Sequence, residues 1–230
     1  MARMRMVERP ADYAPFPPLA REGWPFVLAC AAAAATAFAM DWQAAGWILL
    51  AAGAFCLYFF RDPRRQAFYS ANVAISPADG KVVCIDEVDH PGFSGGRAKR
   101  VAIFLSVFDV HVNRSPAEGR VSLTRYRPGR FHNAMFDKSS EENECNSILI
   151  ETQWGNIEVK QIAGAIARRI ACYCRAGDML GRGQRIGLIR FGSRTEAYLP
   201  LETEIWVKKG DRVRGGVSPL GRMDGRTTAS

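Results

Sequence analysis

Several features are scarce or absent in this 230-residue chain, and each absence narrows its function. It has six cysteines, and no two of them stand in the Cys-x-x-Cys spacing of zinc and redox motifs. The three histidines, His90, His111 and His132, lie far from any metal-ligand spacing. We therefore expect no metal site, and this use of cysteine fits a reducing compartment.

Charge is almost absent from one long stretch. Between Trp24 and Phe60 the only charged residue is Asp41, although 23% of the whole chain is charged. The net charge of +8 lies on residues 61–230, because residues 1–23 carry +1 and residues 24–60 carry −1. A hydrophobic content of 48% excludes wholesale disorder. A basic globular body therefore follows an apolar leader, which excludes a plain cytosolic globule.

The leader predicts a helical hairpin. Its uncharged segments, Trp24–Met40 and Ala44–Phe60, are separated by three residues, and each would extend about 25 Å as a helix, the lower limit for crossing a bilayer core. Arginines before and after the pair place both flanks on the cytoplasmic side. We expect residues 1–65 to be a membrane-anchoring segment that either spans or only enters the bilayer. A cleaved signal peptide and a buried hairpin of a soluble core stay open as alternatives.

Residues 66–230 predict a mainly β (α+β) body. Short segments rich in Val, Ile and Phe, several of them alternating polar and apolar residues, are separated by glycine-containing turns. No sustained helical periodicity follows the leader. The predicted strands are Lys81–Ile85, Val101–Val107, Ile148–Glu151, Ile157–Ile162, Ile186–Phe191 and Glu204–Val207.

Two similar segments, Ala176–Gly183 and Lys209–Gly216, each contain a Gly-Asp pair. They predict strand–turn–strand hairpins, which resemble those of the barrel-sandwich hybrid folds of lipoyl and biotinyl carriers. A carrier would need an exposed lysine at a hairpin tip, and the flanks show no convincing one. We therefore do not expect a carrier function.

Three separated segments contain an aspartate, a histidine and a serine, the residue types that can together activate a hydroxyl as a nucleophile. Asp79 stands on a turn that leads into a strand, His111 stands at the exit of a strand, and Ser193 follows Gly192 where the strand predicted over Ile186–Phe191 ends. A carboxylate can orient an imidazole, and the imidazole can take the proton of the hydroxyl. Any protein of this length contains these three residue types, so these residues alone favour ordinary structural roles for all three.

Several motifs, which occur in a fixed order along the sequence, give this protein a resemblance to a known family. The protein resembles phosphatidylserine decarboxylase in its short prokaryotic form, from about Pro15 to Leu220. The motifs that carry the resemblance are Phe59–Arg64, Ser76–Val82, Phe108–Pro116, Gly129–Asn146, Gln161–Arg169 and Gly192-Ser193. A series of motifs in a fixed order is more specific than any one of them.

The resemblance implies an enzyme that makes its own pyruvoyl cofactor. In that family the backbone is cut before a serine, which corresponds here to the Gly192–Ser193 bond. The serine hydroxyl attacks the preceding carbonyl, and elimination and hydrolysis leave a pyruvoyl group in place of Ser193. Glycine tolerates the unusual backbone conformation that this attack needs. Asp79 and His111 are implied as orienting acid and general base, and the product is a heterodimer of fragments 1–192 and 193–230.

The implied reaction converts phosphatidylserine to phosphatidylethanolamine through a Schiff base between the substrate amine and the pyruvoyl group. His111 is the candidate for reprotonating the product. The long forms have a second histidine three residues after the first, where this protein has Arg114. His111 therefore does both tasks, or another group such as His132 contributes. We expect Arg114, His132, Asn133 and Lys138 to bind the phosphate-containing head group.

The partners expected are the substrate lipid and an anionic membrane surface on the cytoplasmic side, because a basic body follows an apolar anchor. Nucleic acid is not expected, since no aromatic-basic stripe or helix-turn-helix signal is present. A homo-oligomer is left open by the sequence. Two alternatives remain: a membrane-anchored β-domain adaptor without chemistry, and a pyruvoyl decarboxylase of another serine phospholipid such as archaetidylserine. Only the enzymes predict that the backbone is cut before Ser193.

Overall fold

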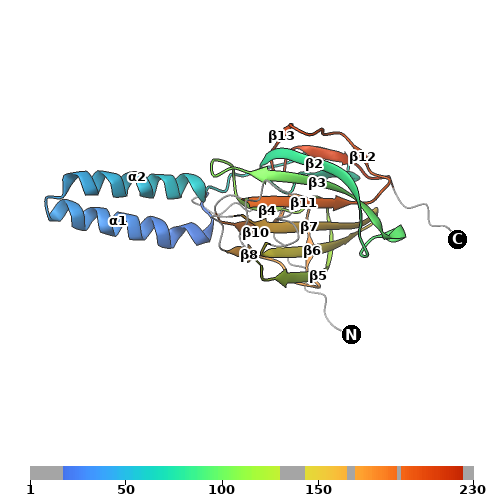
Figure 1. Ribbon diagram of the computed structural model, residues 1–230, viewed down its shortest axis with the longest axis horizontal. Helices are drawn as coiled ribbons and strands as arrows, with labels where there is room; N and C mark the ends of the chain where they lie inside the picture. Colours follow the sequence, from blue (N-terminus) through green and yellow to red (C-terminus); the bar gives the residue numbers. More distant parts are fainter. Residues whose placement is uncertain (1–17, 130–142, 165–168, 191–192, 225–230) are drawn as a thin grey trace. The chain divides into compact units, whose positions relative to one another are not determined.

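A computed structural model describes residues 18–129, 143–164, 169–190 and 193–224 (Figure 1). The protein divides into two compact units. One is Tyr13–Arg64, and the other is Arg65–Ser230 together with Met1–Asp12.

The first unit is the helical hairpin that the sequence predicts. A 3-10 turn, η1 (Arg21–Gly23), leads into α1 (Trp24–Ala39), and α2 (Gln43–Phe59) returns alongside it (Figure 1). Small residues let the two helices approach closely. A Cβ on Gly46 would lie 2.4 Å from the Phe38 ring, so a larger residue there would require this ring to move.

Most large apolar side chains of the hairpin face outward. Trp42, Trp47, Ile48 and Leu28 are all exposed, which would be costly in water. By length and composition, one described helical segment, Arg21–Ala39, could cross a membrane, while α2 is slightly shorter at 17 residues. The hairpin prediction is therefore confirmed as secondary structure.

The second unit is β-rich, as predicted, and is built on an eight-stranded antiparallel sheet with the order β13-β2-β3-β11-β7-β6-β5-β9. Its strands are β2 (Gly80–Asp89), β3 (Arg97–Leu105), β5 (Gly119–Arg127), β6 (Cys145–Thr152), β7 (Gly155–Ala163), β9 (Met179–Leu180), β11 (Ser193–Leu199) and β13 (Arg212–Val213). A short 3-10 turn, η2 (Ser94–Gly96), connects β2 to β3.

Two three-stranded sheets complete this unit. The first has the order β1-β14-β12 and the second has the order β4-β10-β8. Their strands are β1 (Val73–Ile75), β12 (Glu204–Ile205), β14 (Pro219–Arg222), β4 (Val112–Arg114), β8 (Ile170–Cys172) and β10 (Arg185–Ile189). The described apolar core includes a cluster around Val101, Ile103, Leu105, Ala197 and Leu199.

The large sheet repeats one arrangement on both sides of the β11–β7 pair. Ser76–Val82 (SPADGKV) leads into β2, and Ser115–Val121 (SPAEGRV) leads into β5. In each segment the serine hydroxyl donates a hydrogen bond of 2.7 Å to a carbonyl two residues later. β2 and β5 are each irregular directly after the valine that ends the segment. The duplicated segment is a sequence signal that our sequence reasoning missed.

The two Gly-Asp segments belong to the same duplication. Asp178 accepts a hydrogen bond of 3.0 Å from the backbone N–H of Arg175, and Asp211 accepts one of 2.9 Å from that of Lys208. The short strands that follow, β9 and β13, form the two ends of the large sheet. The barrel-like hairpin description is therefore consistent with the structure.

Two long strands of the large sheet, β5 and β11, are not among the predicted strands, and β11 also corrects the prediction for the segment before it. We expected a strand over Ile186–Phe191 that ends in Gly-Ser, but β10 ends at Ile189 and Ser193 opens a new strand, β11. The charges of Arg194 and Glu196 interrupt the apolar pattern, and no strand was predicted between Phe191 and Glu204. In the structure Arg194 and Glu196 are both buried, and their side chains pair at 2.8 Å. A second arginine, Arg100, lies 3.6 Å from the Glu196 carboxylate, so tertiary pairing allows a charged strand in the centre of the sheet.

Candidate active site

Ser193 lies at the start of a central, fully buried strand. Its neighbours across the sheet are Leu105 on β3 and Ala163 on β7. Its hydroxyl is fully buried and has no hydrogen-bond partner among the residues that the structure describes. Buried hydroxyls are normally satisfied, because an unmade bond costs about 1–3 kcal/mol. The position therefore calls for an explanation beyond packing.

His111 reaches the same end of β3 through a short connection. Leu105, the neighbour of Ser193, ends β3, and the backbone then turns at Ser106–Asp109 before reaching His111. The turn is closed by the Asp109 carboxylate, which accepts hydrogen bonds of 2.8 and 2.7 Å from the N–H and hydroxyl of Ser106. His111 is fully buried, so the turn brings a buried imidazole to the region of Ser193.

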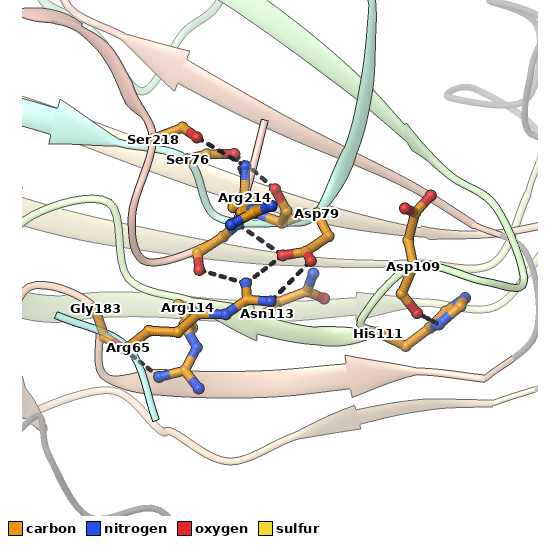
Figure 2. A network of polar contacts seen from close by, with 12 residues as sticks. Arg65, Ser76, Asp79, Asp109, His111, Asn113, Arg114, Gly183, Arg214 and Ser218 are labelled. Atoms are coloured by element: carbon orange, nitrogen blue, oxygen red, sulfur yellow. Dashed lines mark hydrogen bonds and ion pairs between the residues drawn. The ribbon is translucent and has the colours of Figure 1, made fainter. Parts of the chain in front are cut away.

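The described partner of the His111 ring is a backbone carbonyl. Nδ1 lies 3.0 Å from the carbonyl oxygen of Asp109 (Figure 2). A carbonyl can only accept, so this contact assigns the proton of a neutral ring to Nδ1 and makes Nε2 the basic nitrogen. This tautomer suits a group that takes and returns a proton.

Asp79 is held by Arg65 rather than by the histidine. One guanidinium nitrogen contacts Oδ1, and the other donates to Oδ2 at 2.8 Å, while the Gly215 N–H donates to Oδ1 at 2.8 Å (Figure 2). Arg65 also donates to the Gly215 carbonyl at 2.7 Å. Asp79 and His111 thus have separate described partners. The predicted role of Asp79 as the orienting acid stays a prediction.

The turn that carries Asp79 is nevertheless packed close to Ser193 in the sheet. Gly80, which follows it, has a φ of 145°, and a Cβ there would lie 2.1 Å from the Phe104 carbonyl oxygen. Only glycine permits this approach of β2 to β3. Phe104 is in turn paired with Arg194, the residue after Ser193. Asp79 and Ser193 therefore belong to the same end of the large sheet.

Arg114 takes a structural position. It is buried, its guanidinium donates to the Gly183 carbonyl at 3.1 Å, and a Cβ on Gly216 would lie 2.6 Å from its Cδ (Figure 2). Its backbone N–H donates to the Pro77 carbonyl at 2.9 Å, which ties β4 to the turn that carries Asp79. Its predicted role in head-group binding stays a prediction. The other predicted site residues, Gly192, His132, Asn133 and Lys138, lie outside the described residues.

Metal ligands and cavities do not identify this site. Among the described residues, no group of three or more His, Cys, Asp and Glu side chains could hold a metal ion. A cavity of about 800 Å³ is lined by Arg65, Arg182 and Glu151–Trp154, among other residues. Glu151–Trp154 lie just before β7 begins, whereas Ala163 is the last residue of β7. Neither Ser193 nor His111 is among the residues that line this cavity, although Arg65, which holds Asp79, is one of them.

Sequence reasoning missed four buried polar residues next to the site. Asn113 and Thr195 each follow a predicted site residue by two positions, and Gln161 and Asn146 lie on β7 and β6. The signal was present, since Asn113, Asn146 and Gln161 fall inside the motifs that carry the family resemblance. What sequence could not give was their contact.

These features define a β-rich protein with an internal site, in which a buried serine opens a central strand and a buried histidine follows the turn at the end of the neighbouring strand. A family model described as "Phosphatidylserine decarboxylase" matches residues 52–221. A "Phosphatidylserine decarboxylase proenzyme" of Symbiobacterium thermophilum is 48% identical over 208 residues, covering 90% of this protein and 96% of the relative.

Proteins with the same name from two other organisms are similarly close. That of Syntrophus aciditrophicus is 46% identical over 207 residues, covering 88% of this protein and 96% of the relative. That of Magnetococcus marinus is 42% identical over 213 residues, covering 90% and 96%. The protein belongs to the phosphatidylserine decarboxylase family, and it is an enzyme of the carboxy-lyase class.

Proposed function

We propose that this protein is a self-processing, pyruvoyl-dependent decarboxylase that converts phosphatidylserine to phosphatidylethanolamine at a membrane. The observation that carries the proposal is the buried Ser193 hydroxyl, which has no hydrogen-bond partner among the described residues. A side chain that must be consumed to make a prosthetic group fits a position where it does no structural work. The names of the relatives support the substrate and the proenzyme character.

In the proposed processing, the Ser193 oxygen adds to the Gly192 carbonyl carbon while His111 takes the hydroxyl proton. The peptide C–N bond then breaks, the proton passes to the departing amine, and an ester joins the two residues. Loss of the Cα proton of Ser193 and cleavage of its Cβ–Oγ bond leave a carboxylate on Gly192. Water then replaces the nitrogen at the new N-terminus and releases ammonia, so that a pyruvoyl group stands where Ser193 was.

The pyruvoyl group supplies an electron sink for the pair left behind when carbon dioxide departs from the substrate. The surrounding protein has three tasks: to exclude water, to hold the lipid head group and to return a proton to carbon. Burial of Ser193 and His111 meets the first task. For the third we propose His111, whose contact with the Asp109 carbonyl fixes the ring orientation.

The position of Ser193 also supports a lasting association of the two fragments. Cleavage before Ser193 would leave β11 as the first strand of fragment 193–230. In the described sheet β11 is paired along its length with β3 on one side and β7 on the other. Both of those strands belong to fragment 1–192, so we propose a heterodimer held by two hydrogen-bonded ladders and a shared core.

Membrane attachment is proposed from the helical unit. Its outward-facing tryptophans and aliphatic side chains have no cover among the described residues of that unit, and a bilayer would supply one. The charge of +8 on the rest of the protein would favour anionic lipid, and phosphatidylserine is anionic. We propose that both flanks of the hairpin face the cytoplasm.

Intact mass measurement of the denatured protein tests the processing. We expect two polypeptides, the smaller one blocked by a pyruvoyl group, and one uncut polypeptide for Ser193→Ala. Ser122→Ala, on β5, is the control and should be cut like the wild type. An uncut wild-type protein that still decarboxylates would overturn the mechanism. The purified enzyme should also prefer phosphatidylserine over archaetidylserine in vesicles, and the reverse preference would overturn the substrate assignment.

A further inference from the structure

A row of four hydrogen-bonded, buried side chains crosses the interior of the β-rich unit. The Asn146 amide donates to Gln161 Oε1 at 2.9 Å, and the Gln161 amide donates to Asn113 Oδ1 at 2.8 Å. The Asn113 amide then donates to the Thr195 hydroxyl oxygen at 3.2 Å. Three of the four residues are fully buried, and Asn146 is nearly so. Each of the three bonds is therefore made in a region without solvent, where a broken bond is costly.

This amide row joins two sheets. Thr195, Gln161 and Asn146 lie side by side on β11, β7 and β6 of the large sheet, because Thr195 is paired with Gln161 and Gln161 with Asn146. Asn113 lies on β4 of a small sheet. Cross-strand partners share a face, so three neighbouring polar side chains of the large sheet meet one side chain from the opposite sheet.

The small sheet is shaped to accept these amides. Gly187 on β10 is paired with Asn113, and a Cβ at Gly187 would lie 2.6 Å from Gln161 Nε2 and 2.4 Å from the Ala171 carbonyl oxygen. The backbone of β10 thus leaves just enough room for the Gln161 amide. The amide row is a built feature of the interior and not a chance contact.

The ends of the amide row lie next to the proposed reacting groups. Thr195 is two residues after Ser193 on the same face of β11, and Asn113 is two residues after His111. Asn146 is at the end of the segment 129–146, in which head-group contacts are predicted. That segment is also tied to Ala163, the neighbour of Ser193, by a hydrogen bond of 2.7 Å from the Asn143 amide to the Ala163 carbonyl.

We propose that Asn113, Gln161, Asn146 and Thr195 are positioning residues for the self-cleavage before Ser193. Their hydrogen bonds hold the strand that follows His111 against the strand that Ser193 opens, and they fix both relative to the end of the 129–146 segment. The inference rests on the proposed function, since it concerns the efficiency of that cleavage. A displacement of about 1 Å between reacting groups can cost about 100-fold in rate.

The Thr195 hydroxyl gives the sharpest test, because two replacements separate shape from hydrogen bonding. Thr195→Val keeps the shape and removes the acceptor for the Asn113 amide, whereas Thr195→Ser keeps the hydroxyl. The control is Thr203→Val, which removes a fully buried threonine hydroxyl that has no hydrogen-bond partner among the described residues. Thr203 lies beyond the far end of β11, about 20 Å along the strand. The full-length proteins are made by cell-free translation with phospholipid vesicles, and cleavage is followed over time by gel electrophoresis.

We expect Thr195→Val to slow cleavage by about 10- to 100-fold. Thr195→Ser and Thr203→Val should stay within about threefold of the wild type. Cleavage of Thr195→Val at the wild-type rate, or equal slowing by Thr203→Val, would overturn the positioning role. A wild-type protein that is never cut would instead overturn the proposed function, so the two failures are distinguishable.

Gln161→Glu is the second variant, for the case that Thr195→Val does not accumulate. A protonated glutamic acid can still donate to Asn113 Oδ1 and accept from Asn146, whereas the ionised form has no donor. The rate of cleavage relative to the wild type should therefore fall as the pH is raised from about 5 to about 9. A ratio that does not change with pH would contradict the inference.

Discussion

Replacing Arg65 with glutamine should destabilise the β-rich unit by about 3 kcal/mol. The guanidinium contacts both oxygens of the Asp79 carboxylate and also the Gly215 carbonyl, and the two charged side chains are only 10% and 12% exposed. Removing one partner of a buried ion pair costs about 3–5 kcal/mol, because the other charge is left in the interior. We take the lower end, since the Gly215 N–H would still donate to Asp79.

For a unit of this size, a loss of about 3 kcal/mol corresponds to a fall of about 6–12 °C in Tm. The assay is a double-mutant cycle of Arg65→Gln and Asp79→Asn, measured by urea unfolding in a Ser193→Ala background so that all the variants have the same backbone connectivity. We expect a coupling free energy of about 2 kcal/mol.

The control cycle uses the exposed pair of Arg97 and Glu87, which are 3.0 Å apart and 49% and 42% exposed. Exposed pairs contribute about 0–1 kcal/mol. A coupling energy between Arg65 and Asp79 no larger than that of the control pair would refute the reasoning, because it would mean that the carboxylate is not held by this arginine.

Three further predictions concern packing, reactivity and pH. Gly187→Ala should lower the free energy of unfolding in urea by about 2 kcal/mol, because the new Cβ meets the Ala171 carbonyl oxygen and the Gln161 amide. An unchanged urea midpoint would contradict the close approach of Gly187 to these two groups. Hydrogen bonding from the Cys174 thiol lowers the pKa of Cys172 to about 6, so alkylation of Cys172 by iodoacetamide should be close to its maximal rate at about pH 7. A Cys172→Ser variant is the control. An alkylation rate with its pH midpoint near 9 would refute this prediction. The hydrogen bond from Arg100 lowers the pKa of Asp86, so the stability that this pair contributes is present above the unfolded-state pKa of about 3.9 and is lost as the pH falls through the lower folded value. In Asp86→Asn the free energy of unfolding should therefore depend less on pH in that acid range. The same acid slope in the variant and the wild type would contradict this prediction.

Local patterns were enough to predict the two helices and four of the eight strands of the large sheet. The uncharged stretches between Trp24 and Phe60 could form α1 and α2 because each is long and apolar, and β2, β3, β6 and β7 show Val- and Ile-rich or alternating segments. β11 could not be predicted in this way. Its charges interrupt the apolar pattern, and only the structure shows Arg194 and Arg100 around Glu196.

The partners of the site residues were equally inaccessible to sequence reasoning. Asp79 and His111 have the residue types of an acid–base pair, but each makes its described contacts elsewhere, Asp79 with Arg65 and His111 with the Asp109 carbonyl. Arg114, predicted to bind the head group, donates a hydrogen bond to the Gly183 carbonyl in the interior, a contact that its sequence position does not reveal. Residue type and order indicate which groups are available, whereas the choice of partner depends on distances between segments far apart in the sequence.

The sequence by itself determined the division into an apolar hairpin and a basic β-rich body, the family, and the serine on which the chemistry is proposed to occur, because hydropathy, periodicity and ordered motifs are properties of the sequence alone. Only the tertiary structure decided that Ser193 opens a central strand and that its hydroxyl has no hydrogen-bond partner among the described residues. It also decided that four amide and hydroxyl side chains connect this strand to the strand that follows His111. The physical reason is that burial and hydrogen bonding depend on which strands become neighbours. That pairing is set by the sheet as a whole and by no single segment of the sequence.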